Sequence, residues 1–395
     1  MTERVGIIGA GIIGVALGRA LAATRDAEVV VLEKERRVAA HQTGHNSGVV
    51  HAGVYYAPGS LKAALCSRGR ELVRTYCQEN NLPYRELGKI VVAVDHTELS
   101  RLDALEARSL ANGVPGLRRL DAAQMREIEP AIHGVAALHS PHTAVVDYAT
   151  IAESLADDLR QSGGHVLLDC EVTGIVQERG SVRVLTPAGD HLFDRVIACA
   201  GLQSDLVAVM AGAPASPRIL PFRGEYWSLV PHAAALVRGL VYPVPDPRYP
   251  FLGVHFTRGV YDGVTVGPNA VPALAREGYR WRTVSPRHLW DSVSWPGAGP
   301  LAREHWRLGV RELGSSLSKR QYVRQARRFM PDLAPADLVS RSAAGVRAQA
   351  WDRDGTLVDD FVVDQIGLVT LVRNAPSPAA TSALAIADHL IDTYL

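Results

Sequence analysis

The sequence predicts an α/β fold in which a Rossmann-like, nucleotide-binding domain is interleaved with a second domain built on a mainly antiparallel sheet. Two apolar runs near the start, joined by a glycine-rich turn and a helical stretch, indicate parallel strands. A later segment, 221–258, is rich in aromatic and β-branched residues and predicts antiparallel strands. Because no linker separates the two patterns, we expect discontinuous domains: 1–85, 146–218 and 340–395 for the nucleotide, and 86–145 and 219–339 for the substrate.

A dinucleotide-binding fingerprint opens the chain. The apolar run Val5–Ile8 leads into a glycine turn and a helix that reaches about residue 23, and the next strand, 28–32, ends at an acidic residue. Glycines in such a turn let the backbone approach a pyrophosphate, and the helix N-terminus stabilises the phosphates. The acid can accept hydrogen bonds from both ribose hydroxyls. The candidate cofactor residues here are Gly9, Gly11, Ile13, Gly14, Glu33 and Lys34.

The segments that follow favour FAD over NAD. A nicotinamide-binding domain normally continues with further β-α-β units, whereas 43–53 is polar and glycine-rich and suits an extended arm along a longer cofactor. A buried strand over 194–201 ends in a glycine turn, and the run 373–381 precedes a predicted helix over 382–390 whose N-terminal dipole would face the flavin. The candidate FAD contacts in these segments are Thr43, His45, Asn46, Ser47, Gly201, Ala375, Pro378 and Ala379.

Longer sequence blocks are distributed over nearly the whole chain. They are HQTGHNSGVVHAGVYYAPGSLKA (41–63), PFRGEYWSLVP (221–231), YPVPDP (242–247), PFLGVHFTR (250–258), TVGPNA (265–270), AGVRAQA (344–350) and NAPSPAATSA (374–383). Together they resemble the L-2-hydroxyglutarate oxidase/dehydrogenase family of the D-amino-acid-oxidase-type FAD superfamily. The resemblance implies FAD-dependent oxidation of L-2-hydroxyglutarate to 2-oxoglutarate, with hydride transfer from C2 to flavin N5. It also implies that the backbone of Val172 contacts adenine and that Arg347 holds the substrate carboxylate.

Such a reaction needs a base near the hydroxyl and cations for two carboxylates. Histidine suits the base near neutral pH, and His51, at the end of the predicted flavin arm, is the preferred candidate. His255 is the alternative base or a carboxylate ligand, although either histidine could instead be bound only to backbone. The planar fork of Arg347 suits the carboxylate beside the reacting carbon. Candidates for the distal carboxylate are Lys62, which could instead pair with an acid on its own helix, Arg223, which could instead order the flavin, and Tyr242.

The rest of the chain predicts further helices and strands. Asp121 and Gln124 have the spacing of a capping box, and Thr150 with Glu153 predicts another helix start, before a glycine pair that ends the helix. The basic stretch 319–328 is expected to be a solvated helix face rather than a membrane patch. The predicted elements are helices over 62–80, 98–112, 121–128 and most of 278–330, a strand over 90–94, and strands over 166–184 that return to the nucleotide-binding sheet.

Composition excludes several other classes of protein. A net charge of +1 over 395 residues gives no field that would recruit nucleic acid. The fourteen histidines and four cysteines show no metal-ligand spacing, so we expect no metal. No signal peptide and no apolar run of about 18 residues occur. We therefore expect a cytoplasmic protein, which could also contact the inner face of the membrane peripherally. Its electron acceptor is expected to be oxygen or a quinone.

Three alternative functions stay open from the sequence. An FAD-dependent amine oxidase of the glycine or sarcosine oxidase type would share the fold and Arg347 but would need no pocket for a distal carboxylate. A non-catalytic FAD-binding protein would not be expected to keep His51, His255 and Arg347 together. An NAD-dependent dehydrogenase is disfavoured by the polar arm and by the C-terminal block.

Overall fold

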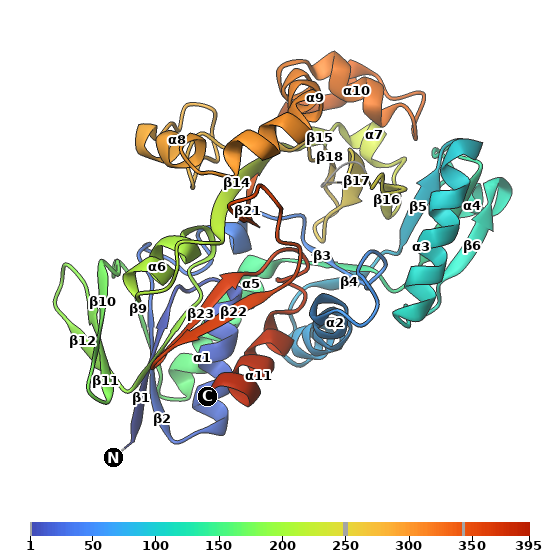
Figure 1. The fold of residues 1–395 in the computed structure, drawn as a ribbon. Helices are drawn as coiled ribbons and strands as arrows, with labels where there is room; N and C mark the ends of the chain where they lie inside the picture. Colours follow the sequence, from blue (N-terminus) through green and yellow to red (C-terminus); the bar gives the residue numbers. More distant parts are fainter. Residues whose placement is uncertain (1, 248–251, 342–343) are drawn as a thin grey trace.

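The computed structural model describes residues 2–247, 252–341 and 344–395, except for the side chains of 308, 311 and 317, and has the predicted α/β fold (Figure 1). Positions 250 and 251 of the sequence block 250–258 lie outside the described residues. The first sheet has six strands in the order β22-β23-β13-β1-β2-β9, all parallel to their neighbours except β22. These strands are β1 (Glu3–Ile8), β2 (Ala27–Leu32), β9 (His165–Leu167), β13 (Arg195–Ala198), β22 (Val362–Ile366) and β23 (Val369–Asn374).

Both faces of this sheet are buried, which explains its nearly continuous apolar strands. In β2, Val29 and Val31 join a cluster on one face, whereas Val30 and Leu32 join a cluster on the other. The first face is covered by α1 (Ile12–Thr24), α5 (Tyr148–Gln161) and α11 (Ala383–Tyr394). The second face is covered by α6 (Ser204–Met210) and a small sheet of β10 (Gly174–Glu178), β11 (Ser181–Leu185) and β12 (His191–Phe193).

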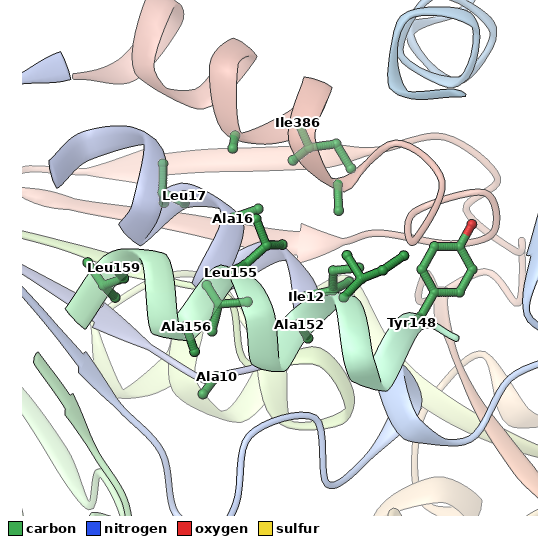
Figure 2. Close-up of a cluster of buried hydrophobic side chains, with 14 of the residues drawn as sticks. Ala10, Ile12, Ala16, Leu17, Tyr148, Ala152, Leu155, Ala156, Leu159 and Ile386 are labelled. Carbon is green, nitrogen blue, oxygen red and sulfur yellow. The ribbon is translucent and has the colours of Figure 1, made fainter. Parts of the chain in front are cut away.

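The core between α1 and α5 follows from helical periodicity. The apolar residues of α5 recur at intervals of three and four, so they form one stripe that faces α1 (Figure 2). The stripe consists of Tyr148, Ile151, Ala152, Leu155, Ala156 and Leu159, and all six are buried. Ile386 of α11 closes the same cluster.

The second large sheet is mixed, with eight strands in the order β20-β15-β18-β17-β16-β5-β7-β6. It is mainly antiparallel, as predicted, but β16 pairs with β5 in parallel. One face packs against α10 (Lys319–Ala326), which contributes Tyr322, and the other packs against α3 (Leu99–Ala111), which contributes Leu102. The strands are β5 (Lys89–Ala93), β6 (Arg118–Asp121), β7 (Ala136–Ser140), β15 (Trp227–Leu229), β16 (Leu240–Pro243), β17 (His255–Arg258), β18 (Val264–Gly267) and β20 (Leu338–Arg341).

Two three-stranded sheets complete the described strands. In one, β14 pairs with β21 so that Phe222 lies opposite Arg347, and this register places Arg347 beside the large sheets. The other pairs the end of the arm, β3, with β8. The strands are β3 (Val49–Val50), β4 (Tyr84–Glu86), β8 (Ala144–Val146), β14 (Arg218–Gly224), β19 (Val271–Pro272) and β21 (Gly345–Trp351).

The remaining helices agree with the predicted segments, except the short α7, which lies within 221–258, where the sequence predicted strands. They are α2 (Leu61–Glu79), α3 (Leu99–Ala111), α4 (Ala122–Ile128), α7 (Pro231–Ala234), α8 (Pro286–Val293), α9 (Ala298–Leu317) and α10 (Lys319–Ala326). The capping box of α4 is confirmed, because Asp121 accepts from the Gln124 amide and the Gln124 side chain accepts from the Asp121 amide. Within the described residues, none of the helices combines the length and the apolar character needed to cross a membrane.

Two local predictions were wrong. Helix α5 begins at Tyr148 rather than at Thr150, because the carboxylate of Asp147 accepts hydrogen bonds from the amides of Ala149 and Thr150 and caps the helix one turn earlier. Of the strands over 166–184, β9 alone joins the six-stranded sheet, because β10 and β11 pair with each other and with β12. The solvated basic face over 319–328 is confirmed, because its arginines are exposed while Tyr322 and Val323 are buried on the opposite side.

Replacing Leu155 by alanine should lower the free energy of unfolding by about 2–5 kcal/mol, because it removes a fully buried side chain from the core of Figure 2. Leu110→Ala is the matched control, since Leu110 is 61% exposed, and it should change stability by less than about 0.5 kcal/mol. Thermal unfolding of the two purified variants measures both effects. Equal destabilisation by the two substitutions would contradict the packing described for α5.

Candidate active site

The glycine turn between β1 and α1 forms a tight cradle that a side chain would fill. Gly9 has a φ of +103°, a region that favours glycine. A Cβ atom at Gly14 would lie 2.0 Å from the carbonyl oxygen of Gly9, so α1 can approach β1 this closely only with glycine there. The Ala10 amide donates to Oε2 of Glu33 at 2.7 Å, which ties the turn to the end of β2. The N-terminus of α1 that follows the turn favours an anionic ligand.

The arm that follows β2 is held in shape by its own side chains. Thr43 lies in a short 3₁₀ turn (Gln42–Gly44), and its hydroxyl accepts from the Ile12 amide at 3.0 Å. Asn46 donates from Nδ2 to the Thr43 carbonyl at 2.6 Å and accepts from the Gly48 amide at 2.8 Å. The arm therefore runs from the start of α1 towards β3 in a defined conformation.

A buried hydroxyl pair fixes the end of the arm. The His51 amide donates to Oγ1 of Thr381 at 3.1 Å. Tyr148, at the start of α5, shares a hydrogen bond of 2.9 Å with the same Thr381 oxygen and donates to the Val49 carbonyl at 3.1 Å. Three segments that are distant in sequence thus determine where His51 lies.

One cavity of about 810 Å³ joins the cradle, the arm and the sheet residues. This volume lies within the range of about 300–1,000 Å³ that small-molecule and cofactor sites occupy. Of the predicted cofactor residues, those that line it are Gly9, Gly11, Ile13, Glu33, Lys34, Thr43, His45, Asn46, Ser47, Val172, Gly201, Ala375, Pro378 and Ala379. The predicted catalytic and substrate residues that line the same cavity are His51, His255, Arg347, Lys62 and Tyr242.

Two neutral histidines face this cavity. Burial lowers the pKa of His51 well below its usual 6.5, reinforced by the charges of Lys89 and Arg347, and its Nδ1 is buried without a hydrogen-bond partner. Burial also lowers the pKa of His255 to about 3. Nδ1 of His255 lies 2.9 Å from the Gly253 carbonyl, which can only accept, so the proton sits on Nδ1 and Nε2 is an acceptor.

Two of the predicted cations line the cavity and make contacts of their own. Lys62 is 7% exposed, and its ammonium pairs at 2.9 Å with Asp359, whose side chain is 95% exposed. Its partner is therefore not an acid on its own helix. Arg347 contacts Tyr226, and burial raises the pKa of Tyr226 against the opposing effect of that arginine. Lys62 and Arg347 both border the cavity, so an anion bound there could contact them.

Lys89 is a functional candidate that the sequence analysis missed. It is 1% exposed at the start of β5, and its ammonium has no hydrogen-bond partner. The ammonium lies 4.9 Å from the ring centres of Tyr55 and Tyr242, both of which line the cavity. Burial lowers the pKa of Lys89 to about 8. The scarcity of lysine, four in the chain, was a signal that could have singled it out.

A separate ionic cluster lies at the cofactor end of the arm. Lys34 pairs with Glu35 at 2.6 Å and with Glu277 at 2.8 Å, and His41 lies 2.9 Å from Glu35. Although burial opposes it, hydrogen bonds to the two carboxylates raise the pKa of Lys34. In the described part of the chain, Glu35, His41 and Glu277 are close enough to hold a metal ion. An ion there would displace the Lys34 ammonium, which already pairs with both carboxylates.

Two predicted site residues lie elsewhere. Gly14 does not line the cavity, because its role is to let α1 approach the Gly9 carbonyl. Arg223 points into a second cavity, since neighbouring residues of β14 face opposite sides and Gly224 and Phe222 flank it. The sequence could not reveal this placement, because it depends on the register between β14 and β21.

Comparison with known proteins identifies the class of this chain. The family model described as FAD dependent oxidoreductase (DAO) matches residues 4–393. The chain therefore belongs to this family of FAD-dependent oxidoreductases, and its cofactor is FAD. The glycine cradle, the acid at the end of β2 and the polar arm fit that cofactor.

Sequence relatives identify the narrower family. The chain is 44% identical over 404 residues to the mitochondrial L-2-hydroxyglutarate dehydrogenase of Homo sapiens, covering 98% of this chain and 87% of that one. It is 44% identical over 389 residues to the L-2-hydroxyglutarate dehydrogenase of Indibacter alkaliphilus, covering 98% and 97%. It belongs to the L-2-hydroxyglutarate dehydrogenase family, which confirms the resemblance seen in the sequence blocks.

Solved structures share the fold. L-α-glycerophosphate oxidase from Mycoplasma pneumoniae, with FAD bound, has a TM-score of 0.80 and 21% identity, covering 99% of this chain and 94% of that one. Glycine oxidase from Geobacillus kaustophilus has a TM-score of 0.73 and 18% identity, covering 99% and 94%. At these identities the likeness concerns the architecture alone.

Gly14→Ala should yield protein with little bound FAD, because the added methyl would push α1 away from the Gly9 carbonyl and open the cradle. The ratio of flavin to protein absorbance after purification measures the effect. Gly299→Ala is the control, since a Cβ at Gly299 meets nothing within 4 Å, and it should retain full FAD. A fully yellow Gly14→Ala protein would show that the cradle tolerates the methyl.

Proposed function

We propose that this protein oxidises L-2-hydroxyglutarate to 2-oxoglutarate. The observation that supports it best is the single cavity that joins the FAD cradle to two neutral histidines and to the cations Arg347 and Lys62. When bound, FAD supplies an acceptor for the hydride that leaves C2 of the substrate. The names of the relatives, 44% identical over nearly the whole chain, support the same substrate.

In this proposal, Arg347 binds the carboxylate next to the reacting carbon. Its guanidinium can make two parallel hydrogen bonds, which fixes the orientation of C2 better than a point charge would. Lys62 and Tyr242 are placed on the same cavity and would bind the distal carboxylate. Arg223 is not part of this set, because it faces the second cavity.

The proposed base is His255, with His51 beside it. His255 is neutral, its Nδ1–H is committed to the Gly253 carbonyl, and Nε2 can accept the proton of the substrate hydroxyl. Stacking on Tyr242, at 3.9 Å between ring centres, holds the imidazole plane. His51, the preferred base in the sequence analysis, has an unpartnered Nδ1 and would hydrogen-bond the substrate from the end of the arm.

Lys89 contributes a buried positive charge behind Tyr55 and Tyr242. The ammonium does not line the cavity, so it acts through the field at the site and through the two rings that it contacts. Its proximity to both histidines helps to keep them unprotonated. We propose it as a positioning residue that favours binding of a doubly charged substrate.

The alternative functions are less well supported by this arrangement. A small amino acid substrate would need one carboxylate partner, yet Lys62 and Lys89, like Arg347, act on His51 as nearby positive charges. A protein without catalytic function would have no use for a second histidine with an unpartnered buried nitrogen. An amine oxidase therefore remains the second candidate, and substrate specificity separates the two.

The domain ranges, the electron acceptor, the location and the membrane contact also stay proposals. The six-stranded sheet draws its strands from 1–85, 146–218 and 340–395, which supports those ranges for the FAD-binding domain, although one strand crosses each of the four boundaries: β4, β8, β14 and β20. The electron acceptor, oxygen or a quinone, and a cytoplasmic location stay predictions. Peripheral membrane contact would fit the exposed Trp290 and Trp306 of α8 and α9, and co-sedimentation with anionic vesicles tests it.

Anaerobic mixing with L-2-hydroxyglutarate should bleach the flavin absorbance, whereas D-2-hydroxyglutarate, L-lactate and sarcosine should not. Arg347→Ala should remain yellow but be reduced at least about 100-fold more slowly, because it loses the bidentate contact at C2. Arg303→Ala, on the exposed side of α9, is the matched control and should behave as wild type. Bleaching by sarcosine instead would replace the proposed reaction by amine oxidation.

The pH dependence of kcat/KM should have no acid limb near 6.5, because burial lowers the pKa of both histidines and keeps them neutral. It should fall above pH 8, where Lys89 loses its charge and attracts the dianionic substrate less. Lys89→Met should remove this alkaline limb and raise KM at least about fivefold. An alkaline limb that persists in Lys89→Met would exclude Lys89 as its source.

His255→Asn should lower kcat by roughly 10²–10⁴-fold at every pH.

A further inference from the structure

A second cavity, of about 390 Å³, adjoins the active site but takes no part in the proposed reaction. His45 of the cofactor arm borders both cavities. The described residues that line the second cavity are His45, Arg223, Glu225, Tyr279, Arg280, Trp281, Arg341 and Ala344. Its volume is within the range of small-molecule sites.

Arg223 gives this cavity a defined binding edge. The side chain is 2% exposed, and its Nε and Nη2 are buried without a hydrogen-bond partner. These two nitrogens form the side of the guanidinium that can grip both oxygens of a carboxylate or phosphate. The guanidinium carbon lies 3.8 Å from the centre of the Trp281 ring, so the stacked tryptophan holds the plane of the guanidinium. Leaving such donors unsatisfied is costly, which indicates a ligand.

The charge around the cavity favours an anion. Three arginines, Arg223, Arg280 and Arg341, face one carboxylate, Glu225. The carboxylate of Glu225 does not satisfy Arg223. Its Oε1 lies 3.4 Å from Nη2 of Arg223 without hydrogen-bond geometry, and the same oxygen lies 3.5 Å from Nη1 of Arg341. Its other oxygen, Oε2, accepts from the hydroxyl of Ser316 and from the side-chain Nδ2 of Asn269. A net positive charge therefore remains for a ligand.

We infer that the second cavity is a binding site for a small oxyanion, a carboxylate or a phosphate, held by the Nε–Nη2 edge of Arg223. Arg280 and Arg341 add positive charge, and the rings of Trp281 and Tyr279 form apolar walls. The site is independent of substrate binding by Arg347, which lies on the other cavity. Because His45 borders both cavities, an anion bound in the second cavity would lie next to the cofactor arm.

Titration of the FAD-loaded enzyme with succinate, and separately with inorganic phosphate, tests this inference through tryptophan fluorescence and the flavin spectrum. Saturable quenching is expected, and it should vanish in Trp281→Phe, which removes the reporting ring. It should persist in Arg347→Ala, which disables the substrate site. In Arg223→Lys, which keeps the charge but loses the paired donors, the dissociation constant should rise at least about tenfold. The tighter of the two probes identifies the anion class.

Arg280→Gln provides a second variant if Arg223→Lys does not fold, and it should weaken binding several-fold while keeping normal FAD content. Loss of the signal in Arg347→Ala would assign the anion to the substrate cavity and overturn the inference. So would the absence of saturable binding, or binding that neither Arg223→Lys nor Arg280→Gln weakens. Because these readouts need no turnover, they do not depend on whether L-2-hydroxyglutarate is the substrate.

Discussion

The hydroxyl of Thr381 is the point on which the organisation of the site depends. It accepts from the His51 amide and shares a hydrogen bond with Tyr148, so one buried oxygen joins the end of the cofactor arm, the start of α5 and the segment before α11. The arm begins at the glycine cradle and ends at His51. Because the Thr381 contact fixes its end, the arm needs no rigid element of its own to hold His51 in position. Removing this hydroxyl would release the His51 amide from the segment before α11, while Tyr148 of α5 would still hold the Val49 carbonyl.

Electrostatics in the cavity depend on burial as much as on charge. His51 and His255 are kept neutral because they are desolvated, and the cations near them act in the same direction. The same desolvation lowers the pKa of Lys89 to about 8, whereas the two aromatic rings beside the ammonium stabilise its charged form. A site with neutral bases and positive surroundings suits an anionic substrate whose hydroxyl must lose a proton.

Local sequence patterns predicted what depends on local physics. The glycine spacing at Gly9 and Gly14 and the acid at Glu33 predicted the cradle, and the sequence blocks predicted the family. Features that depend on pairing between distant strands were missed. Arg223 faces the second cavity because of the register between β14 and β21, and Lys89 lies by the active site because β5 pairs with β16, about 150 residues later. Asp147 was overlooked as a cap because Thr150 offered an equally good signal.

The position of β23 has a consequence for how the protein is made. This strand, Val369–Asn374, is an interior neighbour of β13, and α11 packs on α1, so the last residues of the chain complete the core begun by the first. During synthesis, β1 and β2 can pair early, but β13 has no partner on its other side until residues 369–374 have left the ribosome. Until then the nascent chain exposes an unpaired apolar strand edge, and a chain that stops before Val369 never covers it.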